Sequence, residues 1–250
     1  MPTPDEHENK EAFLKRVRGA LGRSEPILHT PDHASLKTTP PRQEEKVRTI
    51  QAKVEARRPQ LIARLAETAE AASWNVHRVN TAEGAAATVA EIAGRANAKS
   101  IVRSAEEVFS RVDVDGALRG RGLSWTVLAS GGRRRRSDLK RLAFASDLGV
   151  TGVTFAIAET GSCVITPRRG VARLTSLAPP TLVLIVEAEQ VLESLDDFFA
   201  ITRLGYQRDR GRAPSYFNFI SGPSRTADIE QTLTIGVHGP GEVHMVLLGQ

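Results

Sequence analysis

Short apolar runs alternate with helix signals from Trp74 to about residue 147, and this alternation most narrows the possible folds. Thr81 is placed to cap a helix after the first apolar run, WNVHRV (74–79). Ser104–Glu107, directly after the second apolar run SIVR (100–103), has the spacing of a capping box and predicts a helix through Phe109. This strand and helix rhythm predicts a mostly parallel sheet with helices on its faces. The apolar runs are WNVHRV (74–79), SIVR (100–103) and LSWTVLA (123–129), and a helical pattern near 137–147 follows the third.

The second half of the chain departs from that rhythm. VTFAIA (153–158) and SCVITP (162–167) are separated only by Glu159–Gly161, a connection that suits a tight hairpin. TLVLIVEA (181–188) is typical of a fully buried strand, and VHMVLLG (243–249) of a closing strand. The sequence therefore predicts an α/β fold with an open mixed sheet flanked by helices.

The N-terminal part of the chain is expected to be an extension of this domain. Residues 10–21 have apolar side chains at helical spacing before Gly22, whereas 25–43 are rich in proline and lack periodicity. Helical spacing resumes over 44–72, where Pro59 forces a kink or a second helix start. We assign 1–41 to a helix and a proline-rich arm, and 42–250 to the α/β domain.

Composition limits the class of protein. With 250 residues, 40% of them hydrophobic and 25% charged, the chain can bury a sizeable core. A net charge of +5 is explained by anionic metabolites as well as by nucleic acid. The single cysteine, Cys163, excludes an internal disulfide and a self-contained iron–sulfur site. No signal peptide or membrane span is recognisable, so we expect a soluble cytoplasmic protein.

The stretch SGPSRTADIE (221–230) is the most unusual polar segment. It follows the apolar run YFNFI (216–220), and Thr226 is expected to cap a helix that ends at Gly236. A strand end that faces a helix start attracts anions through backbone N–H groups, and Arg225 could bind a phosphate or carboxylate. Ordinary helix capping explains the same hydroxyls and acids.

Two long motifs resemble the LUD-domain family and, within it, the lactate-utilisation C proteins. They are ASDLGVTGVTFAIAETGSCVI (145–165) and FISGPSRTADIEQTLTIGVHGPGEVHMVLL (219–248). Residues 42–144 match only as a general α/β layout, and the first 41 carry no resemblance. The resemblance implies a fold similar to the NagB/RpiA and CoA-transferase superfamily.

The resemblance also implies a role in an L-lactate oxidation system, in which companion proteins carry iron–sulfur clusters. Because Cys163 alone cannot ligate a four-cysteine cluster, we expect no cofactor in this chain and clusters on its partner proteins.

The family pattern points to a set of polar residues in these motifs. Arg225 would clamp a carboxylate or phosphate, Glu159 would act as or orient a general base, and His238 would transfer protons. Each has a structural alternative, such as a solvated charge for Glu159 or loop orientation for His238. The set carried over from the family is Thr151, Glu159, Thr160, Ser221, Gly222, Ser224, Arg225, Thr226, Asp228, Glu230 and His238.

We predict Glu159, Arg225 and His238 as catalytic residues. Thr151, Thr160, Ser221, Gly222, Ser224 and Thr226 are predicted to bind ligand, whereas structural roles are favoured for Asp228 and Glu230.

Other motifs argue against metal and nucleic-acid functions. His238 and His244 are only two candidate metal ligands, and His244 is expected to face outward from its strand, so no metal is predicted. Cys163 lies in an apolar run and is expected to be an inert thiol. The run Arg133–Arg136 could bind phosphates, but such a run is more often a solvated edge, and we do not expect nucleic acid as a partner.

Two functions of different classes remain open. In the first, the chain is a non-cluster subunit of a lactate-oxidising complex that binds iron–sulfur proteins and a small anionic metabolite. In the second, it is a free-standing enzyme of CoA-transferase-like fold that acts on a phosphorylated or CoA-linked metabolite at SGPSRT.

Overall fold

Six parallel strands form the central sheet in the part of the chain that the computed structural model describes, which is residues 4–23, 38–129, 135–168, 171, 173–209, 214, 216–227 and 233–249. Every neighbouring pair of these strands is parallel, as the alternation of apolar runs and helices predicts. The order across the sheet is β1 (Asn75–Val79), β12 (Glu242–Leu248), β7 (Thr181–Glu187), β4 (Leu148–Gly152), β2 (Ser100–Arg103) and β3 (Ser124–Val127).

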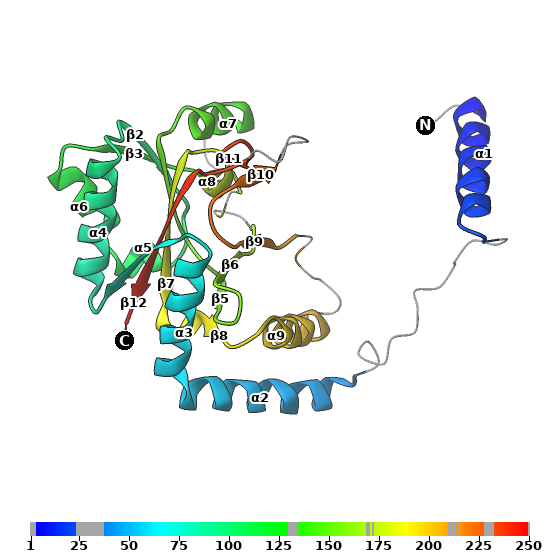
Figure 1. Cartoon of the computed structure of the whole chain (residues 1–250), viewed down its shortest axis with the longest axis horizontal. Coiled ribbons are helices and arrows are strands. Elements are labelled where there is room, and N and C mark those ends of the chain that lie inside the picture. The colour runs from blue at the N-terminus through cyan, green and yellow to red at the C-terminus, as the bar shows by residue number, and fades with distance from the viewer. Residues whose placement is uncertain are drawn as a thin grey trace. The chain divides into compact units, whose positions relative to one another are not determined.

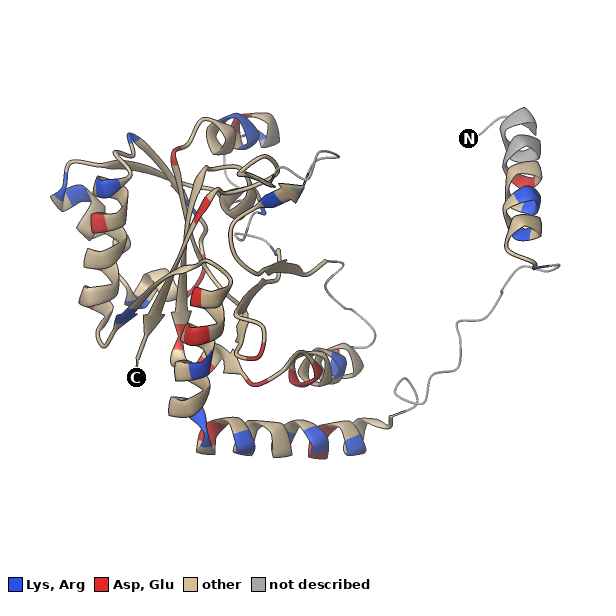
Figure 2. Ribbon diagram, in the orientation of Figure 1, with Lys and Arg blue, Asp and Glu red and all other residues tan. Residues whose placement is uncertain are grey.

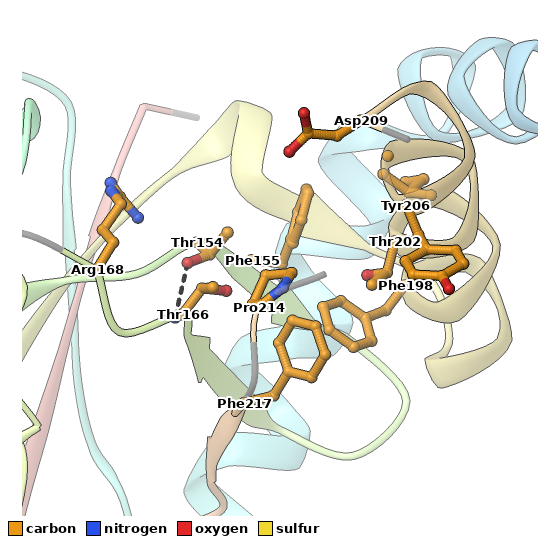
Figure 3. Close-up of a pocket in the computed structure, with 12 residues that line it drawn as sticks. Thr154, Phe155, Thr166, Arg168, Phe198, Thr202, Tyr206, Asp209, Pro214 and Phe217 are labelled. Carbon is orange, nitrogen blue, oxygen red and sulfur yellow. Dashed lines mark hydrogen bonds between the residues drawn. The ribbon is translucent and has the colours of Figure 1, made fainter. Parts of the chain in front are cut away.

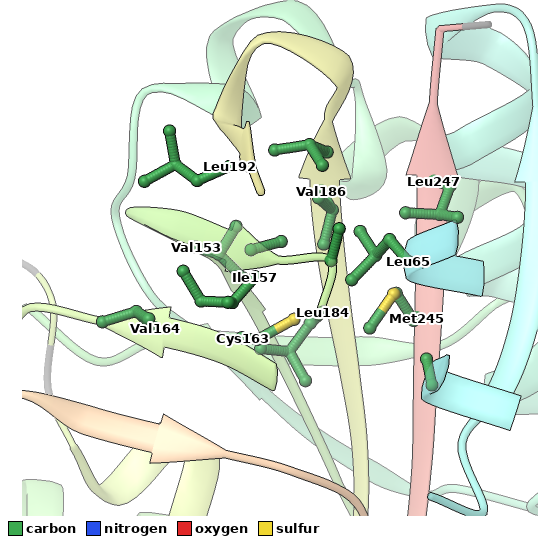
Figure 4. Packing of buried hydrophobic residues seen from close by; sticks show 14 of the residues in the cluster. Leu65, Val153, Ile157, Cys163, Val164, Leu184, Val186, Leu192, Met245 and Leu247 are labelled. Carbon is green, nitrogen blue, oxygen red and sulfur yellow. The ribbon is translucent and has the colours of Figure 1, made fainter. Parts of the chain in front are cut away.

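Helices cover both faces of this sheet (Figure 1). On one face, α4 (Ala82–Arg95) and α6 (Val114–Gly120) pack against Val183 and Ile185 of β7. On the other face, α3 (Arg58–Ala71) packs against Leu184 and Val186, and Figure 4 shows these side chains beside Leu65 of α3. The alternation along β7 therefore divides the core into two layers.

A second sheet carries the antiparallel strands. Its order is β8 (Val191–Leu192), β5 (Phe155–Ile157), β6 (Ser162–Ile165) and β9 (Asn218–Ile220). β5 and β6 form the predicted hairpin, with Ala156 opposite Cys163. The predicted α/β class with a mixed arrangement is confirmed, but the six strands of the central sheet are all parallel, and the antiparallel pairs β5–β6 and β6–β9 lie in this second sheet. A short hairpin can join only antiparallel neighbours, whereas helical crossovers join the central strands.

The helices around residues 40–72 follow the sequence pattern. α2 (Pro40–Ala56) begins inside the predicted proline-rich arm, and α3 starts with Pro59 in its first turn, as expected. α9 (Leu195–Arg208) packs on α2, where the Gln43 side-chain amide donates a 2.8 Å hydrogen bond to the Ala200 carbonyl. The short elements are α5 (Val108–Arg111), α7 (Arg136–Phe144), α8 (Leu174–Leu177) and the 3₁₀ turn η2 (Ala188–Gln190).

The chain divides into two compact units, Met1–Thr39 and Pro40–Gln250. Within the first, α1 (Pro4–Ala20) contains the predicted N-terminal helix and ends near Gly22, which has a left-handed φ of 65°. No helix among the described residues has the length and hydropathy needed to cross a membrane.

The predicted helix from Thr226 to Gly236 is wrong. Arg225–Ala227 form strand β10, which pairs antiparallel with β11 (Leu233–Ile235). The β-branched residues Thr226, Thr234 and Ile235 favour strands, and the pairing of the two ends overrides the local capping signal. Asp228 and Glu230 lie outside the described residues.

The predicted capping box at Ser104–Glu107 is also wrong. The following helix, α5, has a single turn from Val108 and receives no side-chain cap. The Ser104 hydroxyl instead donates to the Glu106 carboxylate. A neighbouring strand offers Glu106 further donors, so a tertiary contact replaces the local one.

A substitution at Gly161 tests how the hairpin is held. This glycine has a φ of 64°, and an added Cβ would lie 2.6 Å from backbone atoms of Thr68 and Ala69. We expect Gly161→Ala to lower the free energy of unfolding by roughly 1–3 kcal/mol, measured by urea denaturation, because helix α3 cannot approach a side chain there. The control is Gly120→Ala, where the added Cβ meets no atom within 4 Å. Equal stabilities of the two variants would contradict this packing.

Candidate functional site

The carboxyl ends of β2 and β4 meet at a switch point in the central sheet. The crossover from β2 to β3 contains α5 and α6, which pack on the face covered by α4. From the carboxyl end of β4 the chain continues into β5 of the second sheet, which packs on the opposite face with Leu184 and Val186. Open α/β sheets bind ligands where neighbouring crossovers leave in opposite directions, so this position is the first place to look for a site.

Glu106 occupies that position. Its carboxylate accepts a hydrogen bond of 2.8 Å from the backbone N–H of Gly152, at the end of β4. The hydroxyls of Thr151 and Ser104 also donate to it, and the Thr151 Oγ1 to Glu106 Oε2 distance is 3.0 Å. Ser104 and Thr151 are themselves buried. One carboxyl group therefore joins the ends of β2 and β4.

Burial raises the pKa of the Glu106 carboxyl, and the three hydrogen bonds oppose that effect only in part. Two arginines of this edge are engaged with other carboxylates. Arg103 makes two 2.6 Å hydrogen bonds to Asp115 and thereby lowers the pKa of Asp115. Arg111 pairs with Glu187 at 2.6 Å. A carboxyl group that keeps its proton at pH values above the ordinary pKa of glutamate is suited to general acid or base chemistry.

A pocket of about 410 Å³ opens beside the same strand end (Figure 3). Thr154 and Phe155, which follow β4, form one wall, and α9 contributes Phe198. Arg168 lies at one end of the pocket, close enough to Glu106 for its charge to lower the pKa of that carboxyl slightly. The volume is within the range of small-molecule sites.

The predicted site residues of the SGPSRT loop lie at the opposite edge of the central sheet. The loop follows β9 of the small sheet, and the Ser224 N–H donates a 2.8 Å hydrogen bond to the Pro240 carbonyl. Gly241 in turn donates to Pro180, immediately before β7. The loop therefore lies at the amino edge, and a strand, not a helix, follows it, so the expected anion site at a helix start is absent from the described residues.

Several of these residues contact one another. The Thr160 hydroxyl donates to Ser162 at 2.9 Å, and Ser162 and Ser221 share a 2.6 Å hydrogen bond. The backbone N–H of His238 donates to the Ser224 hydroxyl at 3.3 Å. The structure thus joins Thr160 to Ser221 and Ser224 to His238.

The remaining predicted residues have separate surroundings. The Arg225 guanidinium donates to the Ser73 hydroxyl, just before β1. Thr226 pairs with Thr234 in the β10–β11 ladder. The Glu159 carboxylate accepts a 2.9 Å hydrogen bond from the backbone N–H of Leu195, the first residue of α9.

Two glycines let these loops approach helix α3. Gly222 has a φ of 113°, and an added Cβ would lie 2.3 Å from the Ala72 carbonyl oxygen. Gly161 makes the corresponding approach to Thr68 and Ala69. Close packing against α3 therefore accounts for a glycine at position 222, which the sequence did not reveal.

Thr151 belongs to the carboxyl edge with Glu106, apart from the loop residues. Sequence reasoning missed Glu106 as a site residue because Ser104 and Glu107 match a capping box. The signal that could have identified it is an Ser-x-Glu step directly after an apolar run, which in a parallel sheet lies at the carboxyl edge.

His244 does not face outward as predicted; it is 6% exposed because α4 covers its face of the sheet. Its Nδ1 lies 3.0 Å from His77 Nε2, and its Nε2 lies 3.1 Å from a Glu242 carboxylate oxygen. Burial lowers the pKa values of both histidines. His238 lies elsewhere, in the exposed loop before β12.

The described part of the chain bears on the predictions about metal ligands, the single thiol and the basic residues. No group of three or more His, Cys, Asp or Glu side chains gathers there in a metal-binding arrangement. Cys163 is fully buried, and burial raises the pKa of its thiol. Figure 2 shows basic and acidic residues interspersed along α2 and α3. Arg133 and Arg134 lie outside the described residues, and α7 begins at Arg136.

Comparison with known proteins gives a consistent picture. A family model described as LUD domain matches residues 62–248. Lactate utilization protein C 1 of Bacillus mycoides is 31% identical over 183 residues, which cover 72% of this chain and 76% of that protein. Lactate utilization protein B 1 of the same organism is 32% identical over 114 residues, 45% of this chain but only 22% of that protein.

Among solved structures, a DUF162 family protein from Deinococcus radiodurans has a TM-score of 0.51 and 20% identity. The match covers 77% of this chain and 98% of that one. At this identity the likeness shows the fold alone, and it agrees with the predicted open α/β architecture.

Neutralising Glu106 should change how stability depends on pH. Because the folded-state pKa of Glu106 is raised, wild-type stability falls as the pH rises from the ordinary glutamate pKa towards the raised one. We expect Glu106→Gln to gain stability relative to wild type across that window, measured by urea denaturation at a series of pH values. The control is Glu107→Gln, whose side chain is 84% exposed. The same pH profile in both variants would refute the buried carboxyl.

Proposed function

Because this chain belongs to the LUD-domain family, we propose that it is a component of an L-lactate utilisation system that oxidises lactate to pyruvate. It acts there with separate iron–sulfur proteins and carries no cluster itself. The observation that carries the proposal is the similarity to a protein named Lactate utilization protein C 1, which extends over three quarters of that protein.

The cysteine content supports the absence of a cluster in this chain. Iron–sulfur clusters are held mainly by several cysteine thiolates, and the sequence has one cysteine. Cys163 lies in the core between the small sheet and α3, beside Leu184 (Figure 4). Its thiol is 0% exposed, so a cluster on another protein cannot reach it without opening that core.

The second resemblance supports a system of more than one component. A protein named Lactate utilization protein B 1 shares similarity with 45% of this chain, while 78% of its own length lies outside the match (100% less the matched 22%). The shared part supports a common domain, and the remainder leaves room for separate chemistry. We therefore place electron transfer on partner proteins.

The geometry favours this role over a free-standing enzyme that acts at SGPSRT. That alternative relied on a helix start behind the loop to bind a phosphate or CoA-linked anion. The loop instead leads into strand β10, and Arg225 is hydrogen bonded to Ser73. A small anionic metabolite finds a better-placed site at the carboxyl edge, near Glu106 and Arg168.

A deletion strain tests the pathway. We expect a strain without the gene to lose growth on L-lactate as sole carbon source and to grow normally on pyruvate. The intact gene should restore growth on lactate. Undiminished growth on lactate, in a host with no second lactate dehydrogenase, would remove the assignment.

A substitution at Cys163 tests the absence of a cluster. We expect Cys163→Ala to complement the deletion strain fully, because the thiol ligates nothing, although loss of a buried sulfur should cost roughly 1 kcal/mol of stability. The wild-type chain, purified without oxygen, should contain no stoichiometric iron. Bound iron that disappears in Cys163→Ala would contradict the proposal.

A further inference from the structure

The pocket at the carboxyl end of β4 is lined by aromatic rings and by an arginine, Arg168. We propose that it binds an organic carboxylate whose apolar part is about the size of a phenyl ring. The proposal goes beyond the role in lactate utilisation, because lactate has only a methyl group to place against aromatic walls.

The walls of the pocket are aromatic. The rings of Phe155 and Phe217 each meet Phe198 edge to face, with centroid separations of 5.9 and 5.2 Å. Phe198 is 1% exposed, so it is fixed within the core, whereas Phe155 and Phe217 keep part of their surface open. Burial of apolar ligand surface against such rings favours binding.

Polar groups gather at one end of the pocket. Arg168 is exposed, and no described residue accepts a hydrogen bond or forms an ion pair with its guanidinium. Thr154 accepts a 3.0 Å hydrogen bond from the backbone N–H of Thr166, which leaves the Thr154 hydroxyl hydrogen to donate to a ligand. A guanidinium beside a hydroxyl donor is suited to a carboxylate.

The charges fix the orientation of the ligand. Asp209 lies across the pocket from Arg168, on the side of α9 that also carries Tyr206 (Figure 3). A carboxylate is attracted to Arg168 and repelled by Asp209, so the anionic group faces Arg168 and the apolar part lies along the phenylalanines. A neutral molecule of the same shape would gain only the apolar contacts.

The test is isothermal titration of the full chain with 3-phenylpropanoate and with its neutral analogue 3-phenylpropan-1-ol. We expect saturable binding of the acid, and we expect Arg168→Gln to weaken it by roughly tenfold or more, since a charge-assisted hydrogen bond is lost. The same substitution should leave the affinity for the alcohol unchanged. The control is Arg141→Gln, because the Arg141 side chain is 78% exposed on α7 and does not line the pocket.

A second variant blocks the pocket without removing charge. Gly205 of α9 lines the pocket, and an added Cβ meets no atom within 4 Å. Gly205→Leu should therefore fill the pocket, keep or raise the melting temperature, and abolish binding of both the acid and the alcohol.

The outcomes separate clearly. Loss of acid binding in both pocket variants, with Arg141→Gln unaffected, supports the site. Absence of saturable binding of the acid by the wild-type chain up to millimolar concentrations would overturn it. So would equal affinity of Arg168→Gln and wild type for the acid, because the carboxylate would then lie elsewhere. Lactate growth is independent of these results, so failure here leaves the pathway assignment standing.

Discussion

Burial of strand β7 on both faces is the constraint on which the rest of the structure depends. Its inner residues have no exposed surface, and its backbone hydrogen bonds are satisfied by β12 on one side and β4 on the other. A parallel strand in that position needs helices over both faces, because each crossover must cover apolar surface that would otherwise meet water. Crossovers on both faces require a point where their direction changes. That point lies between β2 and β4, and Glu106 and the pocket are located at its carboxyl edge.

Glu106 holds the ends of β2 and β4 together at a cost in free energy. Burial of a carboxyl group is costly unless hydrogen bonds compensate, and here three donors compensate only in part, since the pKa remains raised. A smaller neutral side chain could accept the Gly152 N–H at lower cost. The network therefore keeps a carboxyl group of raised pKa at the carboxyl edge of the sheet, a combination more typical of functional sites than of groups that only stabilise a fold. By contrast, Arg103–Asp115 and Arg111–Glu187 are matched pairs that stabilise the surrounding loops.

The sequence predicted those features that local patterns determine. The apolar runs became β1, β2, β3 and β7, and the short Glu159–Gly161 connection became the β5–β6 hairpin. The features it missed depend on residues far apart in the chain. Thr226 pairs with Thr234, Glu106 binds the end of β4, and His244 is buried by α4 and contacts His77. A capping signal shows only that a polar group has nearby donors, and it does not reveal that another strand supplies better ones. For the site, the sequence pattern placed SGPSRT at a strand end that faces a helix start, whereas the loop leads into β10 and lies at the amino edge of the central sheet, because its contacts come from Pro240 and Ser73, far away in the chain.

The SGPSRT loop and the tip of the β5–β6 hairpin lie near the amino edge of the central sheet, whereas Glu106 and the pocket lie at the carboxyl edge. This separation follows from packing. Gly161 and Gly222 each bring a loop against the backbone at the C-terminal end of α3, and Ser162 and Ser221 join those two loops. A side chain at either glycine would push the small sheet away from α3 and the central sheet. Because β5 and β6 carry Phe155 and Thr166 into the pocket, a shift of the hairpin would also displace the pocket walls. The predicted loop residues at one edge thus help to hold the walls of the pocket near the other.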